Sequence, residues 1–152
     1  MMPRSSQWIH DMNQLGKAGI PFLFIIDFEL EMPIVLSLDK IGEEILFKFN
    51  DVCNYESGSP CKKLLAFKPK PMDFDNYKKA YGAVQKEIHH GNSFLLNLTF
   101  PTPIETNYKL KELFEVAKAR YKLLYKDQFI VFSPETFVKI KENKIYIYPM
   151  KG

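Results

Sequence analysis

The chain has 152 residues, of which 46% are hydrophobic, 26% are charged and 14% are aromatic. This composition is too apolar and too aromatic for an intrinsically disordered chain, and the length is enough for one domain with a buried core. The net charge of +3 comes from 21 basic and 18 acidic residues spread over the whole sequence, so we predict no basic surface for DNA or RNA.

The first part of the chain carries the alternating pattern of short strands. Apolar residues alternate between two faces from Pro21 to Leu30, and turn residues such as Pro33 and Gly42 separate the runs that follow. The expected strands are 21–30, 34–38, 45–49 and 64–67. Asp27 and Glu29 share one face of the first strand, where solvent-facing carboxylates are commoner than a catalytic pair.

The period changes after residue 70. Apolar residues recur every three or four positions over residues 74–88, which predicts an amphipathic helix. Asp73 or Asp75 can cap its first turn, and Gly91 can end it in the left-handed conformation. The histidines at 89–90 lie in the last turn, where positive charge complements the helix dipole, so capping or solvation is favoured over metal binding.

The last part of the sequence mixes strand and helix patterns. Residues 93–100 alternate strictly and predict the clearest strand, and residues 110–124 restore the helical period, with Thr106 or Asn107 as a cap. The strands expected after them are 129–133, 137–140 and 145–148, the last two joined by a tight polar loop. Because strands and helices do not alternate regularly, we predict an α+β fold, layered, with a largely antiparallel sheet and flanking helices.

Targeting signals are absent from the sequence pattern. No apolar run approaches the roughly 20 residues that cross a bilayer, and the first residues lack the apolar region of a secretory signal. We therefore expect a cytoplasmic protein without a membrane partner. Cys53 and Cys61 are expected to stay free thiols, since disulfides are rare in that compartment.

Three motifs, in the same order and spacing, resemble those of chorismate-binding enzymes. Residues 91–99 resemble the signature G-D-x-Y-Q-x-N-L-S/T, residues 132–137 resemble the S-P-E-x-F turn, and residues 147–152 resemble the P-I-K-G-T motif that opens the catalytic half. Residues 21–28 also resemble the P-F-x-F-x-I-D-F strand of the aminodeoxychorismate synthase branch of this family. The resemblance therefore covers most of the chain.

The resemblance implies the amino-terminal part of the chorismate-binding enzyme fold. Residues 1–70 would form its strand-rich region and residues 71–152 the truncated start of the catalytic fold. In aminodeoxychorismate synthases the motif lysine is thought to attack chorismate at C2, and the resemblance gives this catalytic role to Lys151. Anthranilate synthase component I has alanine at that position, so the lysine favours amination of chorismate to 4-amino-4-deoxychorismate, a step in para-aminobenzoate and folate biosynthesis.

The same resemblance implies partners and a metal. Ammonia would come from a glutamine amidotransferase subunit, and Mg²⁺ would hold the chorismate carboxylate through ligands beyond residue 152. No residue of the chain itself is predicted to bind a metal or cofactor. No tryptophan site is carried over, because residues 124–129 replace the N-P-x-P-F/Y segment of other members. Glu135 is expected to fix the S-P-E turn by hydrogen bonding.

Two alternative interpretations remain open at this point. One is anthranilate synthase component I or another chorismate enzyme, and the other is a non-catalytic module that binds a small ligand or docks the amidotransferase. A free carboxylate one residue after Lys151 favours its charged ammonium form, which cannot attack. Since the expected metal ligands are also missing, we expect the 152-residue chain by itself to be inactive.

Overall fold

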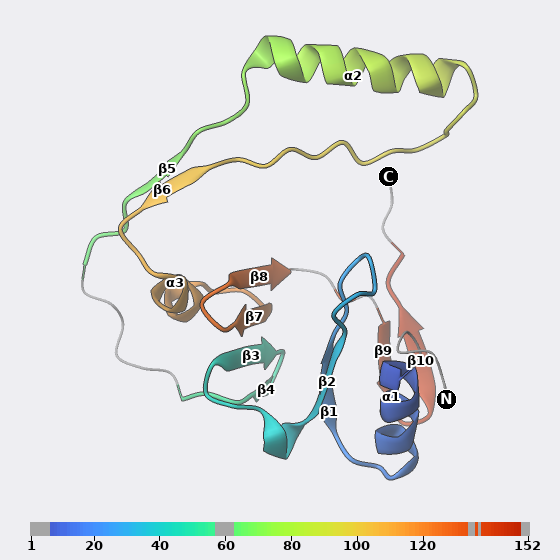
Figure 1. The fold of residues 1–152 in the computed structure, drawn as a ribbon, viewed down its shortest axis with the longest axis vertical. Coiled ribbons are helices and arrows are strands. Elements are labelled where there is room, and N and C mark those ends of the chain that lie inside the picture. The colour runs from blue at the N-terminus through green and yellow to red at the C-terminus, as the bar shows by residue number, and fades with distance from the viewer. Residues whose placement is uncertain (1–6, 57–62, 134–135, 137, 150–152) are drawn as a thin grey trace. The chain divides into compact units, whose positions relative to one another are not determined.

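The computed structural model describes residues 7–56, 63–133, 136 and 138–149. The chain divides into a first unit, residues 1–56 and 119–152, and a second unit, residues 57–118, which can be followed by colour in Figure 1. Helices and antiparallel strand pairs occur together, so the predicted α+β class is confirmed. The division of the sequence near residue 70 stays a prediction.

The largest element of the first unit is a four-stranded antiparallel sheet, whose strands are all labelled in Figure 1. Its strands in spatial order are β4 (Val52–Cys53), β3 (Ile45–Phe49), β7 (Tyr121–Tyr125) and β8 (Phe129–Ser133). β3 pairs with β7 along its whole length, so a strand predicted from local alternation finds its partner in a distant part of the chain. Cys53 is a free thiol, as expected, and Cys61 lies outside the described residues.

One face of this sheet carries the apolar core of the first unit. Leu23, Ile45 and Phe47 are buried together in one cluster. The half-buried apolar side chains packed around them are Leu36, Ile41, Leu123 and Tyr125. Because burying one such side chain contributes roughly 1.5–3 kcal/mol, the cluster stabilises the pairing of β3 with β7.

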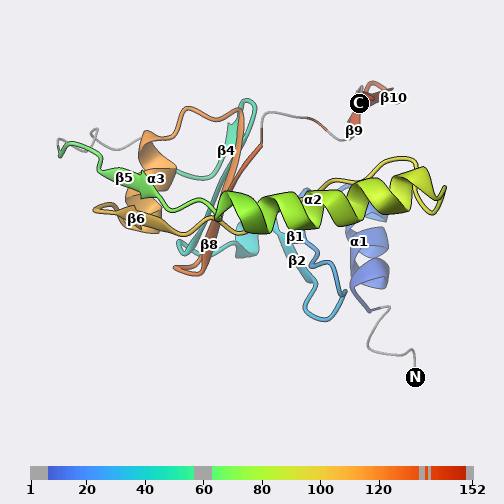
Figure 2. The same ribbon diagram turned by 90° about the horizontal axis from the view of Figure 1, so that it is seen from above.

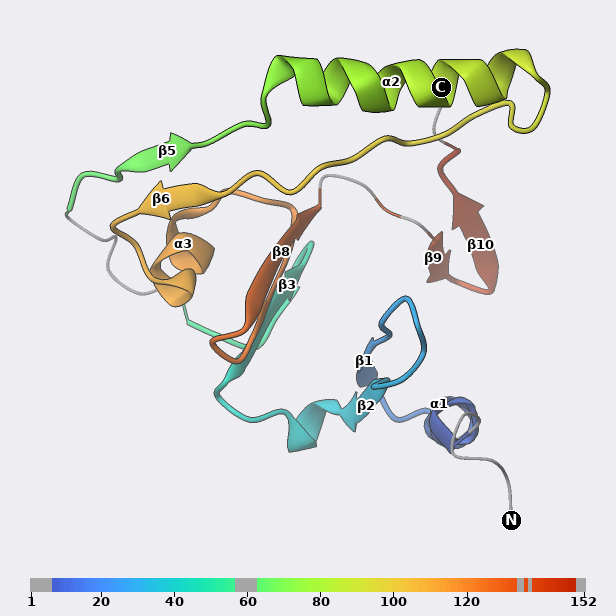
Figure 3. The ribbon, with the colours of Figure 1, turned by 45° about the horizontal axis from the view of Figure 1, so that its top comes forward.

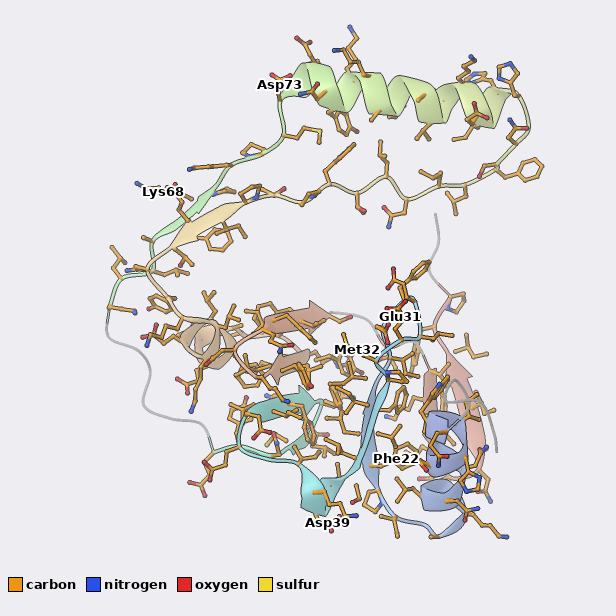
Figure 4. All side chains as sticks on the ribbon, in the orientation of Figure 1. Phe22, Glu31, Met32, Asp39, Lys68 and Asp73 are labelled. Atoms are coloured by element: carbon orange, nitrogen blue, oxygen red, sulfur yellow. The ribbon has the colours of Figure 1, made fainter. Side chains whose placement is uncertain are left out.

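The first predicted strand ends earlier than its sequence pattern suggests. β1 (Phe22–Ile25) pairs with β2 (Ile34–Ser37), and the chain then turns. The Asp27 carboxylate accepts hydrogen bonds from the amides of Glu31 and Met32, at 2.9 and 3.0 Å, in the connection where Figure 4 labels both residues. The bond from Glu31 is the main cause that holds the pKa of Asp27 below its usual range. The prediction of a strand up to residue 30 was wrong because Asp27 closes a turn.

Two further elements of the first unit have no counterpart among the predictions. α1 (Gln7–Lys17) lies against β2, and the 3₁₀ helix η2 (Leu38–Lys40) follows β2 directly. The unit ends in a hairpin of β9 (Val138–Lys141) and β10 (Lys144–Ile147). Glu142 and Asn143 form its turn with φ of 53° and 58°, as in primed turns that match the strand twist. The predicted hairpin is confirmed with slightly shifted bounds.

In the second unit, α2 (Phe74–His89) begins where the sequence predicts. The carboxylate of Asp73, labelled in Figure 4, accepts hydrogen bonds from the amides of Asp75 and Asn76, at 2.9 and 3.3 Å. These bonds satisfy two of the amide groups that the first turn leaves without helical partners. Asp73 is therefore the N-cap.

Replacing Asp73 with alanine is expected to destabilise α2 by about 1 kcal/mol, because the first-turn amides lose their acceptor. Amide hydrogen exchange at Asp75 and Asn76 should become faster. The matched control is Asp75→Ala, which removes only a charge near the helix dipole and is expected to cost less. Equal exchange rates in the two variants would contradict the cap.

The other end of α2 also follows the prediction. Gly91 has φ +77° and ends the helix in the left-handed conformation. The Nδ1 atoms of His89 and His90 lie 2.6 and 2.7 Å from the carbonyl oxygens of Gln85 and Lys86. Both rings therefore occupy the helix end, and the predicted capping role is confirmed. In the part of the chain that the structure describes, no helix is long and apolar enough to cross a bilayer.

A short two-stranded ladder and α3 complete the second unit. Its elements are β5 (Phe67–Pro69), β6 (Ile104–Thr106) and α3 (Leu110–Val116), which lie close together in Figure 2. Lys109 is the N-cap of α3, and its amide donates to the Glu112 carboxylate at 2.7 Å. The prediction that Thr106 or Asn107 caps this helix was wrong.

Asn107 instead joins two segments of the second unit. Its side-chain amide donates to the carbonyl of Leu64, and its side-chain oxygen accepts from the amide of Ala66, both at 2.9 Å. The strand expected at 64–67 correspondingly begins only at Phe67. Both polar groups of the Asn107 side chain are therefore bonded to the segment 64–66, which explains why this side chain does not cap α3.

The segment 93–100 is extended but forms no strand within the described ranges. It runs alongside α2 (Figures 1 and 3), and Phe100 contacts Tyr77 edge-on with 6.0 Å between ring centroids. Phe94 and Leu95 are 94% and 81% exposed. The strand prediction was wrong because a strand needs a hydrogen-bonding neighbour, and alternation alone does not supply one.

The predicted helix 110–124 was right only in its first half. α3 ends at Val116, and residues 121–125 form β7. In β7 the side chains of Lys122 and Leu124 are buried, while the other three residues of the strand are half-buried. Pairing with β3 and β8 on both sides overrides the local helical period.

Candidate functional site

The residue with the predicted catalytic role, Lys151, lies outside the described residues. Glu135 of the S-P-E turn does so too, and its expected hydrogen bond stays a prediction. The structure does describe Ser133 and Thr136, on either side of this turn, and the β9–β10 hairpin that leads to Pro149. The candidate site is therefore built from the residues around Thr136.

Thr136 belongs to a hydrogen-bonded network that joins two distant segments. Its hydroxyl contacts the hydroxyl of Tyr121, which also accepts a hydrogen bond from Nδ2 of Asn50 at 3.0 Å. Oδ1 of the same Asn50 accepts from Nε of Arg120 at 2.7 Å. The Arg120 guanidinium lies 5.9 Å from the centroid of the Tyr121 ring. One asparagine thus fixes both an arginine and a tyrosine.

The β3–β7 ladder explains why these residues meet. Asn50 follows the last residue of β3 in a turn and has φ +55°, a conformation that asparagine tolerates better than most residues. Its amide donates to the carbonyl of Arg120 at 3.1 Å. Arg120 directly precedes β7, so antiparallel pairing places the end of β3 beside the start of β7.

The surroundings of Tyr121 favour negative charge. The hydrogen bond with Thr136 is the main cause that holds the pKa of the Tyr121 hydroxyl below its usual range. The bond from Asn50 and the positive charges of Arg120 and Lys139 act in the same direction, and burial acts against them. Arg120 and Lys139 therefore lie near enough to act on the Tyr121 hydroxyl, although the hydrogen bond from Thr136 acts on it more strongly.

An open pocket of about 320 Å³ lies at this position. The side chains that line it are Lys48, Asn50, Asp51, Arg120 and Lys139, and all of them are polar or charged. Three cations and one carboxylate face the same space, so the pocket suits an anion rather than an apolar ligand.

The described residues do not form a magnesium site. Across residues 7–56, 63–133, 136 and 138–149, no group of three or more His, Cys, Asp or Glu side chains could hold a metal ion. Among the described residues that line the pocket at Tyr121, Lys48, Arg120 and Lys139 are cations and Asp51 is the one carboxylate. Mg²⁺ prefers oxygen ligands, among them carboxylates, so this lining does not fit it.

The first of the three motifs lies in the second unit. After Gly91, the Asn92 side chain donates to the Glu87 carboxylate at 2.6 Å, and the Ser93 hydroxyl donates to the carbonyl of Leu95 at 3.0 Å. These are local contacts within the segment that follows α2. The motif residues therefore make short-range structural bonds here.

Sequence reasoning missed the network around Tyr121. It placed Tyr121 in a helix and Asn50 just after the strand expected at 45–49, although the fold brings these two residues, 71 positions apart, into contact. The alternation of Tyr121, Leu123 and Tyr125 with Lys122 and Leu124 was the signal for a strand in this region. That signal could have placed Arg120 at a strand start.

Comparisons with known proteins identify the class of this chain. A sequence profile of the chorismate binding enzyme family matches residues 52–152, the region that contains the S-P-E turn and Lys151. With its α+β fold, the chain belongs to the chorismate-binding enzyme family. The resemblance inferred from the motifs is confirmed.

Two curated relatives cover nearly the whole chain. An uncharacterized PabA-like protein of Pasteurella multocida is 43% identical over 148 residues, which are 95% of this chain and 45% of the relative. An uncharacterized PabA-like protein of Haemophilus influenzae is 43% identical over 150 residues, which are 95% of this chain and 44% of that protein. The chain thus spans less than half the length of these relatives. No solved structure matches the chain.

Proposed function

We propose that the complete protein acts as aminodeoxychorismate synthase component I, which converts chorismate and ammonia to 4-amino-4-deoxychorismate. The observation that carries this proposal is the lysine at 151, within the family-matched region and in the P-M-K-G sequence that resembles the P-I-K-G motif. Family membership supports chorismate as the ligand, and the lysine favours amination over the anthranilate reaction.

The proposed chemistry needs Lys151 as an uncharged amine. Its Nζ lone pair forms a bond to C2 of chorismate while the bond from C4 to the hydroxyl oxygen breaks, and the hydroxyl leaves as water after taking a proton. Ammonia then forms the bond to C4, and the lysine leaves C2. A lysine serves as a nucleophile only when its surroundings lower its pKa, by desolvation or by a neighbouring cation.

Two further components belong to the proposal. A glutamine amidotransferase subunit supplies ammonia, and Mg²⁺ is bound by residues beyond position 152. The supporting reason is the resemblance of the three motifs to those of the family. A glutamine-dependent reaction should appear only when an amidotransferase is added, whereas ammonia should support the reaction without it.

The proposal is tested by product analysis. Purified complete protein is incubated with chorismate, ammonium and Mg²⁺, and the products are separated and identified by mass spectrometry. We expect 4-amino-4-deoxychorismate. Anthranilate or isochorismate as the main product would refute the assignment to the aminodeoxychorismate branch and favour one of its relatives.

The 152-residue chain alone is expected to produce no 4-amino-4-deoxychorismate under the same conditions. The proposed metal ligands are not on it, and a carboxylate one residue after Lys151 would stabilise the ammonium form. The complete protein at equal molar concentration is the control. Product formation by the short chain above the rate without protein would contradict this prediction.

A further inference from the structure

The proposed amination gives no role to the charged side chains that line the pocket beside Tyr121. Lys48, Arg120 and Lys139 contribute three positive charges, and Asp51 contributes one negative charge. The lining therefore carries a net charge of +2, from three minus one. A ligand that neutralises this lining carries two negative charges.

We propose that this pocket, lined by Lys48, Arg120 and Lys139, binds a small dianion whose charge lies on carboxylate or phosphate oxygens. The inference goes beyond the proposed function, because it involves neither Lys151 nor the amination of chorismate. The volume of about 320 Å³ lies at the lower end of the range for small-molecule pockets, and it exceeds the space that a single simple anion fills.

The three cations have no ion-pair partner among the described residues. By contrast, Lys63, Lys70 and Lys141 each lie next to a carboxylate. Lys48 is also only partly exposed and faces another lysine, Lys122, directly across the β3–β7 ladder. Like charges placed opposite each other on a sheet are unfavourable, and an anion near Lys48 would relieve this repulsion.

Arg120 is held in position for such a ligand. Its Nε donates to Asn50, and Asn50 is fixed in turn through Tyr121 and Thr136. Within the described parts of the chain its terminal guanidinium nitrogens make no hydrogen bond, so they keep donors for a carboxylate or phosphate. A guanidinium whose orientation is already fixed loses less entropy on binding an oxyanion.

Because the pocket lining carries charges of both signs, two substitutions are expected to change the affinity for a dianion in opposite directions. Arg120→Gln removes a charge-assisted donor and is expected to weaken binding of a dianion about tenfold or more. Asp51→Asn removes the negative charge found among the described lining residues and is expected to tighten binding several-fold. Lys144→Gln is the matched control, since Lys144 lies on the same hairpin as Lys139, has no ion pair in the described residues and does not line the pocket.

The experiment is a calorimetric titration of the complete protein and its variants. The probes are succinate as a dicarboxylate, glycerol 3-phosphate as a phosphate dianion and acetate as a monoanion. We expect a dianion to bind at least about tenfold more tightly than acetate, and added salt to weaken the binding. The comparison of succinate with glycerol 3-phosphate identifies which oxyanion the pocket prefers.

Several outcomes would overturn the proposal. These are equal affinities for acetate and both dianions, an absence of binding, or equal losses in Arg120→Gln and Lys144→Gln. Because Arg120→Gln could disturb the turn at Asn50, Asp51→Asn provides an independent test by gain of affinity. A Lys151→Ala variant should bind the dianion like the parent, so failure of the amination proposal and failure of this one are distinguishable.

Discussion

Lys151→Ala in the complete protein is expected to lower the rate of chorismate amination by at least about a thousandfold, since removing a nucleophile removes the covalent route. The affinity for chorismate should change much less, because the role proposed for the amine lies in bond formation. The measurement is the initial rate of 4-amino-4-deoxychorismate formation with ammonium as the nitrogen source, which excludes effects on the amidotransferase.

Two variants separate chemistry from charge. Lys151→Arg keeps the positive charge but cannot supply an uncharged amine, so we expect it to be as inactive as the alanine variant. Lys144→Ala removes a lysine from β10 close in sequence to Lys151 and should retain the parent rate. Activity of Lys151→Arg near that of the parent would show that charge, and not nucleophilic attack, is the contribution of residue 151.

Local signals predicted those parts of the fold that depend on neighbouring residues. The period over residues 74–88, the Asp73 cap and the Gly91 stop all act within one helix, and the structure contains each of them. The turn at 142–143 and the strand 129–133 are likewise set by nearby residues. Such features need no knowledge of distant contacts.

The errors concern segments whose structure depends on a partner. Residues 121–125 satisfy a helical period, but they pair with β3 on one side and β8 on the other. Residues 93–100 alternate more strictly, yet no described strand lies next to them. Residue propensity and periodicity cannot decide whether such a segment becomes a strand. The strand with which it would pair lies far away in the sequence, or the segment has no such partner.

The same limit applies to the candidate sites. Lys151 could be predicted as a site residue because a short motif of contiguous residues carries it, and a motif of this kind can be recognised in one sequence. The pocket combines Asn50, Arg120 and Lys139 from three separate segments, and only the β3–β7 ladder brings the first two together. Nothing in the spacing of these residues marks them as neighbours.

The β3–β7 ladder therefore supports both the core and the pocket, and Phe47 is the side chain on which we expect it to depend most. Phe47 is 3% exposed, lies opposite Leu123 and stacks on Phe49 at 5.2 Å. Phe47→Ala should lower the free energy of unfolding by about 3–5 kcal/mol, because it removes buried apolar surface and leaves a cavity.

Denaturant titration of the variants measures this effect, and an unchanged slope shows that the folded state has kept its compactness. The matched control is Phe28→Ala in the same unit, because the Phe28 ring is 96% exposed and its loss should change stability by less than about 0.5 kcal/mol. Similar losses in both variants would mean that the buried face of β3 is not the core. Since β3 ends at the turn that holds Asn50, the Phe47 variant should also bind the dianion more weakly, which couples the stability of the sheet to the pocket at its end.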